Sequence, residues 1–260
     1  MAVTIGSISG RRFGINIVSS WHKVEYSQMG SWPDDAHLGR RYDYSTEYVT
    51  TLKEQWETGG SDFKGAYFQM DRCKLSPKSS ARIPIVLAGQ SDRGVSFAAT
   101  HCDYNFCLGG GVNHPGKCVN VPARVLKYAQ KTGRDADAYM LFMVIAADTD
   151  EAAFAMWDSY EQGADQAART HLLGHEAHYT NTKATFMAAA VQRNSSPVNF
   201  NTGTIFGSHQ TCARLLEVAV LPGVAGIMLC FDDFIAGMDA FADRIQPLMA
   251  CRANRSARAA

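Results

Sequence analysis

The sequence predicts an α/β protein built around a parallel β-sheet. Its 260 residues are 46% hydrophobic and 19% charged, which is enough to bury a sizeable core. The apolar runs are continuous rather than alternating, as is typical of strands covered on both faces. Helix-like stretches with turn residues at both ends lie between these runs. A strand followed by a helix, repeated along the chain, indicates right-handed βαβ units.

Five apolar segments are expected to form the strands, of which YNFCL is the shortest and weakest. In chain order they are Phe13–Val18, Ile83–Ala88, Tyr104–Leu108, Tyr139–Ala147 and Gly226–Phe231. Helices are expected at Arg41–Trp56, Val121–Lys131, Thr149–Ala168, Ser208–Ala219 and Phe234–Met249. Thr149 offers a capping hydroxyl at a helix start, and Gly133 offers the usual glycine stop.

Two segments depart from this alternation. Residues of about 60–75, with Gly65 inside DFKGAYFQM, are expected to form a small hairpin insertion. The polar segment of about 170–198 has no clear period and is expected to be an irregular loop. Residues 1–252 are therefore expected to form one α/β portion, followed by a solvated tail at 253–260.

The composition excludes several classes of partner. Lys and Arg together number 25, as do Asp and Glu, so no basic field attracts nucleic acid or an anionic membrane. No apolar run is long enough for a membrane span, and the N-terminus lacks a secretory signal. The seven cysteines are odd in number and irregularly spaced, which favours a reducing, cytoplasmic compartment. Small molecules and other proteins are the expected partners.

Five strands of this kind fit either an open doubly wound sheet or most of a (β/α)8 barrel, and periodicity does not choose between them. Several runs, however, resemble the bacterial-luciferase-like flavin monooxygenases, and among them the pyrimidine monooxygenases. The resemblance covers nearly the whole chain except about 170–195 and the Arg-rich tail. The runs are SISGRRFGINIVSSWHKVEYSQMGSWP, RRYDYSTEYVTTLKEQWETGGSDFKGAYFQMDRCKLSP, LAGQSDRG, YNFC, LFMVIAADTDEAA and MLCFDDFIAGMDAFADRIQPLM.

This resemblance implies a (β/α)8 barrel that binds FMN. It also implies a reaction in which reduced flavin and O2 open the ring of uracil or thymine. A separate flavin reductase would supply the electrons from NADH or NADPH, and self-association of the chain is a further expectation. In that family the strand like Phe13–Val18 is the fourth, so the resemblance implies an incomplete barrel with strands 4–8, whose first three strands precede Met1.

Five residues match flavin-contacting positions of the family. With a period of two, Asn16 faces the barrel interior near the carboxyl end of its strand, where such barrels place their sites. Glu25 lies in the loop Trp21–Tyr26, and Arg41 and Tyr42 are expected to open the next helix. Without the resemblance, Asn16 is a turn cap, Glu25 a solvated acid and Arg41 an ordinary charged helix start.

Ser91 is the fifth position. It ends LAGQS, between a strand and a helix-like run that begins near Arg93. Its hydroxyl and the free amides of a helix start form an anion site of phosphate size. Helix capping alone is the simpler interpretation, and both can hold together. Gly89 and Gln90 are expected to share the site.

Other signals are weaker. His171, His175 and His178 have helical spacing but lack a clear fourth ligand, so no metal site is expected. Asp232 and Asp233 suit catalytic or Mg²⁺-binding carboxylates, although a helix cap is favoured. No catalytic acid or base is identified, because the flavin itself performs the oxygen chemistry. The alternatives are a related flavin monooxygenase acting on a nitrilotriacetate-like or sulfonate-like substrate, and a non-catalytic remnant.

Overall fold

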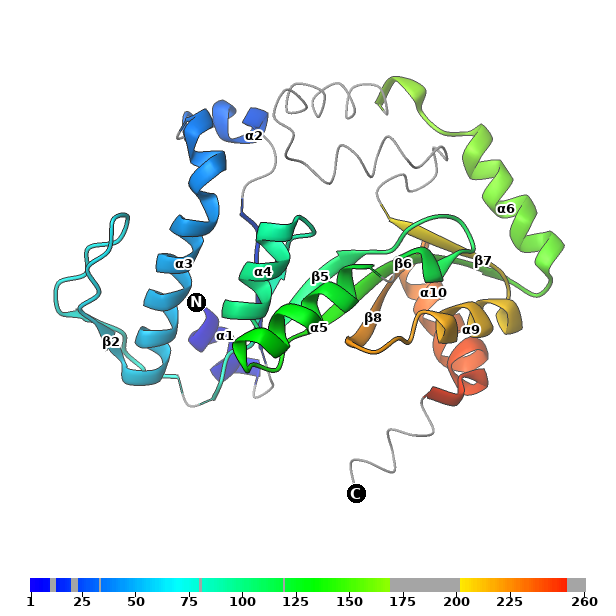
Figure 1. Cartoon of the computed structure of the whole chain (residues 1–260). Helices are drawn as coiled ribbons and strands as arrows, with labels where there is room; N and C mark the ends of the chain where they lie inside the picture. Colours follow the sequence, from blue (N-terminus) through cyan, green and yellow to red (C-terminus); the bar gives the residue numbers. More distant parts are fainter. Residues whose placement is uncertain are drawn as a thin grey trace. The chain divides into compact units, whose positions relative to one another are not determined.

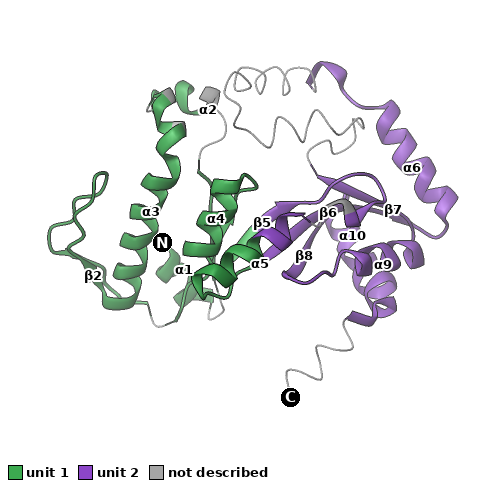
Figure 2. Ribbon diagram, viewed as in Figure 1, with its two compact units in different colours: residues 1–105, 125–137 green, residues 106–124, 138–260 purple. Residues whose placement is uncertain are grey.

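The computed structural model describes residues 1–9, 13–19, 23–32, 34–79, 81–118, 120–168 and 202–251 (Figure 1). The chain divides into two compact units, coloured separately in Figure 2. The first comprises Met1–Asn105 and Val125–Asp137, and the second comprises Phe106–Arg124 and Ala138–Ala260. The expected loop at about 170–198 and the three histidines within it lie outside the described residues.

The first unit alternates strands and helices. Its elements are α1 (Ala2–Ser9), β1 (Ile15–Ile17), α2 (Lys23–Gln28), α3 (Asp35–Thr58), β2 (Gly60–Ser61), β3 (Cys73–Lys74), β4 (Ile85–Ala88), α4 (Asp92–His101) and the start of β5 (Tyr104–Leu108). The strands β1 and β4 pair in parallel, with Asn16 opposite Val86. The strand order is β1-β4-β5-β6-β7, and β8 pairs with β6.

Helices α3 and α4 pack against each other, and one apolar cluster joins them to β1 and β4. Ile17 from β1 and Leu87 from β4 lie in this cluster together with Tyr42, Val49 and Phe97. Because side chains alternate along a strand, Asn16 lies on the opposite face of β1, where it is exposed.

A hairpin follows α3 at the position that the sequence predicts. The strands β2 and β3 pair antiparallel, and an antiparallel bridge joins Lys64 to Gln69. The carboxylate of Glu47, on α3, accepts hydrogen bonds from the backbone N–H groups of Ala66, Tyr67 and Phe68 at 2.8–3.0 Å. One acid therefore satisfies three backbone donors that the turn leaves free.

The second unit is built around β6. Helix α5 (Asn120–Thr132) lies mostly in the first unit, which contains Val125–Asp137. The elements of the second unit are the end of β5, η1 (Pro115–Cys118), β6 (Asp137–Ala147), α6 (Asp150–Gln162), β7 (Gly203–Ser208), α9 (His209–Val218), β8 (Val224–Cys230), α10 (Phe234–Ala240), η2 (Phe241–Ile245) and η3 (Gln246–Leu248). The carboxyl half of β6 pairs in parallel with β7, and its amino half pairs in parallel with β8. All of these pairings are parallel, which confirms the α/β fold with a parallel sheet.

The strand β7 is not expected from the sequence, because GTIFGS contains two glycines and only a short apolar run. Tertiary contacts stabilise it. The backbone N–H of Phe206 donates to Asn113 Oδ1 at 2.8 Å, and Asn113 Nδ2 donates to the Phe206 carbonyl at 2.9 Å. The side-chain amide of Asn113 thus mimics a neighbouring strand.

Several helix boundaries differ from the expected ones. Helix α3 begins at Asp35 rather than Arg41, because the carboxylate of Asp34 caps it by accepting from the His37 N–H at 2.6 Å. Helix α6 ends at Gln162, directly before Gly163, and does not continue to Ala168. The expected helix Phe234–Met249 is regular only in α10 and then passes through a π-helical turn and a 3₁₀ turn at Pro247.

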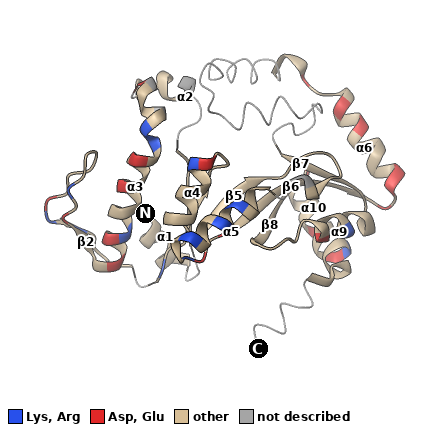
Figure 3. Cartoon of the chain, in the orientation of Figure 1, with Lys and Arg blue, Asp and Glu red and all other residues tan. Residues whose placement is uncertain are grey.

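Charges of both signs are spread over the helices. The charged residues of helix α5 are all Lys or Arg, whereas those of α6 are all Asp or Glu (Figure 3). Among the described residues, no helix combines the length and the hydropathy that crossing a bilayer requires.

Candidate functional site

Four of the five expected flavin contacts have described side chains, and all four belong to the first unit. Asn16 lies on β1, Arg41 and Tyr42 lie on α3, and Ser91 follows β4. Because α3 begins at Asp35, Arg41 and Tyr42 lie in its second turn and do not open the helix. Glu25 lies within the short helix α2 and not in a loop, and its side chain is outside the described residues.

Ser91 is the N-cap of α4. Its Oγ accepts a hydrogen bond from the Gly94 N–H at 3.1 Å, and its carbonyl accepts from the Val95 N–H at 2.9 Å. The capping interpretation is therefore confirmed. The remaining N–H groups of this first turn, together with the helix dipole, favour a bound anion, although Asp92 also lies in the turn.

The turn before α4 packs tightly against Tyr42. A Cβ atom at Gly94 would lie 2.6 Å from the Tyr42 hydroxyl oxygen, and one at Gly89 would lie 3.2 Å from the Gly94 Cα. The Gly89 carbonyl accepts from the buried Asn105 Nδ2 at 2.7 Å. A side chain at position 94 would clash with the phenol, and one at position 89 would be tightly packed, so the two glycines let the backbone approach Tyr42. Asn105 on β5 holds the turn through its bond to the Gly89 carbonyl.

The ring of Tyr42 also lies close to two guanidinium groups. Its ring is 7% exposed and contacts Phe97, with a centroid separation of 5.6 Å. The Arg41 and Arg93 guanidinium carbons lie 5.1 and 5.7 Å from the ring centroid. Arg41 Nε is buried and has no hydrogen-bond partner among the described residues. A buried donor without an acceptor costs about 1–3 kcal/mol, so this atom is suited to an acceptor on a ligand.

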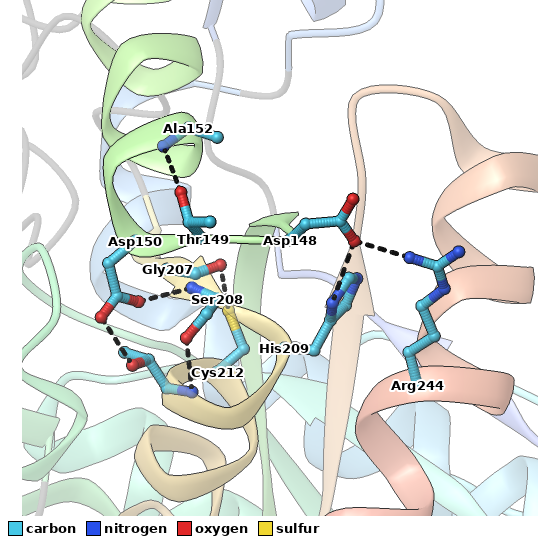
Figure 4. A network of polar contacts seen from close by, with 10 residues as sticks. Asp148, Thr149, Asp150, Ala152, Gly207, Ser208, His209, Cys212 and Arg244 are labelled. Atoms are coloured by element: carbon cyan, nitrogen blue, oxygen red, sulfur yellow. Dashed lines mark hydrogen bonds and ion pairs between the residues drawn. The ribbon is translucent and has the colours of Figure 1, made fainter.

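A second polar network lies at the carboxyl ends of β6 and β7, in the second unit (Figure 4). Asp148 follows β6, and its Oδ1 accepts from Arg244 Nη1 at 2.7 Å and lies 3.9 Å from His209 Nδ1. Thr149 caps α6 by accepting from the Ala152 N–H at 3.1 Å, as the sequence predicts. His209 and Arg244 are not identifiable from the sequence, because neither belongs to a local motif.

Asp150 continues this network from α6 to α9. Its carboxylate accepts from the Ser208 N–H at 2.6 Å and from Thr211 Oγ1 at 3.2 Å. These hydrogen bonds, with that from the Ser208 backbone the strongest, lower the pKa of Asp150. The network therefore ties the start of α6 to the junction of β7 and α9.

The two acids after β8 have structural partners. Asp233 caps α10 by accepting from the Ala236 N–H at 3.0 Å, which confirms the capping interpretation. Asp232 accepts a hydrogen bond from the Tyr160 hydroxyl, and this bond raises the pKa of Tyr160 to about 12. A phenol held protonated in this way does not act as a base near neutral pH.

The buried thiols are unsuited to nucleophilic chemistry. Burial raises the pKa of Cys102 and of Cys212 to about 12, so neither forms a thiolate at neutral pH. Within the described part of the chain, no group of three or more His, Cys, Asp or Glu side chains could hold a metal ion. The described polar groups considered for the first-unit site are the Asn16 amide, the Arg41 guanidinium, the Tyr42 phenol, the Ser91 hydroxyl and the backbone N–H groups of α4.

Comparison with known proteins identifies the relatives of this chain. The family model for luciferase-like monooxygenases matches residues 1–226. The pyrimidine monooxygenase RutA of Klebsiella pneumoniae is 51% identical over 253 residues, which cover 97% of this chain and 70% of that protein. The RutA of Cronobacter sakazakii is 51% identical over 97% of this chain and 75% of its own length, and that of Escherichia coli is 49% identical over 98% and 70%.

Solved structures share the fold at low sequence identity. Riboflavin lyase RcaE, solved with modified FMN and riboflavin, gives a TM-score of 0.78 at 16% identity, covering 97% of this chain and 66% of that one. EDTA monooxygenase EmoA from Chelativorans sp. BNC1 gives a TM-score of 0.73 at 17% identity, covering 96% and 69%. At these identities the likeness establishes the fold alone.

Proposed function

Because the chain belongs to the luciferase-like monooxygenase family, we propose that it is an FMN-dependent monooxygenase that opens the pyrimidine ring of uracil or thymine with O2. The pyrimidine substrate is supported by the relatives, which are named pyrimidine monooxygenases and match almost the whole chain at about half identity. A flavin reductase that uses NADH or NADPH is the proposed source of reduced flavin.

The observation that carries the FMN proposal is that the first unit contains two sets of hydrogen-bond donors suited to a ligand. The first turn of α4, capped by Ser91, presents backbone N–H groups suited to a phosphate. Arg41 Nε is a buried donor that lacks an acceptor among the described residues. FMN has both a phosphate and carbonyl acceptors on its ring system, so its chemistry matches these donors.

Each residue has a distinct role in this proposal. Ser91 and the α4 amides would bind the phosphate, Arg41 would donate to an anionic or carbonyl oxygen, and the buried Tyr42 ring would form a rigid wall. The exposed amide of Asn16 can donate to and accept from the edge of a flavin or pyrimidine. Glu25 is the proposed acceptor for a ring N–H or a ribityl hydroxyl.

When bound in its reduced form, FMN supplies the oxygen-activating chemistry. The residues of this chain bind and orient the reactants and exclude water from them. The phenol of Tyr42 is buried against Phe97, so it restricts solvent beside Arg41. A drier environment strengthens the hydrogen bonds of the guanidinium to an anionic ligand.

The proposal extends to the fold. The sheet is assigned to a (β/α)8 barrel in which β1 takes the place of the fourth strand. Support comes from the parallel pairing of β1 with β4 and from Ser91, which follows the carboxyl end of β4, the end at which barrels hold their active sites. Asn16 lies in β1, one residue before its carboxyl end.

The experiment is a two-stage assay of the purified chain. FMN is titrated first, and consumption of uracil and thymine is then followed with FMN, a flavin reductase, NADH and O2. We expect saturable FMN binding and loss of the pyrimidine. If the chain binds FMN but turns over nitrilotriacetate or a sulfonate and no pyrimidine, the proposed substrate is wrong and the alternative one is correct. Failure to bind FMN would indicate a non-catalytic protein.

A further inference from the structure

A cavity of about 430 Å³ lies in the first unit, at the amino-terminal ends of β4 and β5. Helix α3 contributes Lys53, Trp56 and Glu57 to its lining, and the segment before β4 contributes Lys78 and Arg82. Asp103, which precedes β5, and Arg134, which precedes β6, complete the charged lining. Ser91 lies at the other end of β4, so this cavity is separate from the proposed flavin site.

The lining contains more positive than negative charge. Four basic side chains, those of Lys53, Lys78, Arg82 and Arg134, face two acidic ones. One of the two acids, Asp103, already has partners: it forms an ion pair with Arg82 and accepts a hydrogen bond from the Ile85 N–H at 2.8 Å. Three cations and Glu57 remain, which leaves the cavity with an excess of positive charge.

Two of these cations also contact the end of α4. Lys53 Nζ donates to the His101 carbonyl at 2.7 Å, and Arg134 Nη2 donates to the Cys102 carbonyl at 3.2 Å. These bonds complement the helix C-terminus, which explains why cations gather here. Among the described residues, each of these two cations makes one such bond, whereas an ammonium has three donors and a guanidinium has five.

The remaining donors point to a missing acceptor. Arg134 Nε is buried and has no hydrogen-bond partner among the described residues. Burial, and then the positive charge of Arg134, lower the pKa of Lys53, against the smaller opposing effects of Asp103 and Glu57, so repulsion between the two cations is not fully compensated. An anion between them would relieve this repulsion and accept from the unused donors.

The cavity also has an apolar wall. Trp56 is partly buried against the apolar cluster that α3 and α4 share with β1 and β4, and Trp56 and Ile83 both line the cavity. A fixed indole next to cations suits a flat molecule that carries a negative group. The volume lies within the range of about 300–1,000 Å³ that is usual for small-molecule sites.

We propose that this cavity binds a small organic oxyanion, with a carboxylate or phosphate group held by Lys53 and Arg134 and a flat apolar part against Trp56. Lys78 adds charge at the exposed rim. The site is independent of FMN binding and of the monooxygenase reaction. The two oxyanion groups share this chemistry, and the experiment distinguishes them.

Calorimetric titration of the full chain tests the proposal with phenyl phosphate, benzoate, inorganic phosphate and benzyl alcohol. We expect saturable binding of phenyl phosphate or benzoate, with the tighter of the two identifying the preferred group. Inorganic phosphate should bind more weakly because it lacks the apolar part, and neutral benzyl alcohol should not bind. Absence of saturable heat with both aromatic anions at millimolar concentration would overturn the proposal.

Variants locate the bound anion. Arg134→Lys should weaken binding of the aromatic anion about tenfold, because it removes the buried Nε donor while keeping the charge. Lys78→Gln should weaken it about threefold, and because Lys78 is exposed the variant should fold normally. Lys127→Gln, an equal charge change on the exposed face of α5, is the matched control and should leave the affinity unchanged.

The flavin site must be excluded as the place of binding, since it also suits a flat anion. We expect saturable binding of the aromatic anion, with its sensitivity to Lys78→Gln, to persist in Ser91→Ala and in the presence of saturating FMN. Loss of the phenyl phosphate signal in either case would assign the anion to the start of α4 and overturn the proposal. Equal effects of Lys78→Gln and Lys127→Gln would overturn it as well.

Discussion

At the scale of single residues, the contact between Tyr42 and Gly94 is the tightest constraint on the proposed flavin site. A side chain at position 94 would lie 2.6 Å from the phenol oxygen. We expect Gly94→Ala to lower the free energy of unfolding by about 1–3 kcal/mol through overpacking. Chemical denaturation measures this change, and adding Tyr42→Phe should restore part of it, because the substitution removes the clashing oxygen.

Gly39→Ala is the matched control for this substitution. Gly39 is a helical glycine of α3, and a Cβ atom added there would meet no atom within 4 Å outside its own helical turn. Alanine should therefore stabilise the helix by about 0.5–1 kcal/mol. A loss of stability in Gly39→Ala equal to that in Gly94→Ala would show that the effect is not specific to the phenol contact.

Arg41 provides a test that separates ligand binding from folding. We expect Arg41→Lys to weaken FMN binding about tenfold, because lysine lacks the buried Nε donor. The stability of the FMN-free protein should change little, since this donor has no partner among the described residues. Fluorescence titration and denaturation measure the two quantities. A destabilised protein with unchanged FMN affinity would assign Arg41 a structural role instead.

At the scale of helices and strands, the Asp150 network predicts a dependence of stability on pH. The hydrogen bonds from Ser208 and Thr211 lower the pKa of Asp150 in the folded state relative to the unfolded state. The folded state thus binds this proton less readily. The stabilisation is present above the unfolded pKa and is lost as the pH falls through the folded pKa.

We therefore expect Asp150→Asn to lower the melting temperature at pH 7, and the difference from the unmodified protein to shrink as the pH falls through the folded pKa of Asp150. Thermal unfolding across this range is the measurement. Glu151→Gln, one residue further along the same helical turn, is the control and should have little effect at any pH. A difference that stays constant with pH would mean that Asp150 acts through packing and not through its charge.

Some elements are predictable from the sequence and others are not. Tyr104–Leu108 forms a strand with the predicted bounds, although it is the weakest of the five expected strands, because aromatic and apolar residues alternate with one amide in a short run. The predicted start of α3 is wrong because DAHLG contains a glycine and suggests a turn, whereas Asp34 caps a helix there. The strand β7 escapes prediction because its stability comes from β6 and Asn113, which are distant in sequence.

In the candidate site, too, some features are predictable from the sequence and others are not. Ser91 and Asp233 are recognisable as caps because the partners of a cap lie three residues away. The buried Nε of Arg41 and the packing of Tyr42 on Gly94 are not recognisable, since they depend on the approach of α3 to α4. Local sequence therefore predicts local hydrogen bonds, and long-range contacts need the fold.

At the scale of the whole molecule, binding of FMN should stabilise the folded chain. At a free concentration of about one hundred times Kd, linkage adds about 2.7 kcal/mol to the free energy of unfolding. Ser91→Ala should lower the stability of the FMN-free protein by about 1 kcal/mol through loss of the cap, and should also reduce the gain from a fixed FMN concentration. Denaturation with and without FMN measures both effects.

Ser208→Ala is the matched control, because Ser208 caps α9 in the same way, by accepting from the Thr211 N–H at 3.3 Å. It should lose a similar amount of stability without FMN but keep the full gain on adding FMN. Identical FMN responses of the two variants would remove Ser91 from the proposed phosphate site.

The pairing of β6 with two strands has a consequence for how this chain tolerates change. Phe142 and Met143 are paired with both β7 and β8, so eleven residues of one strand set the register of two neighbours. The register of β7 therefore depends on β6 and not on the length of chain that leads to it. A single inserted residue in the middle of β6 would therefore shift one neighbour against the other.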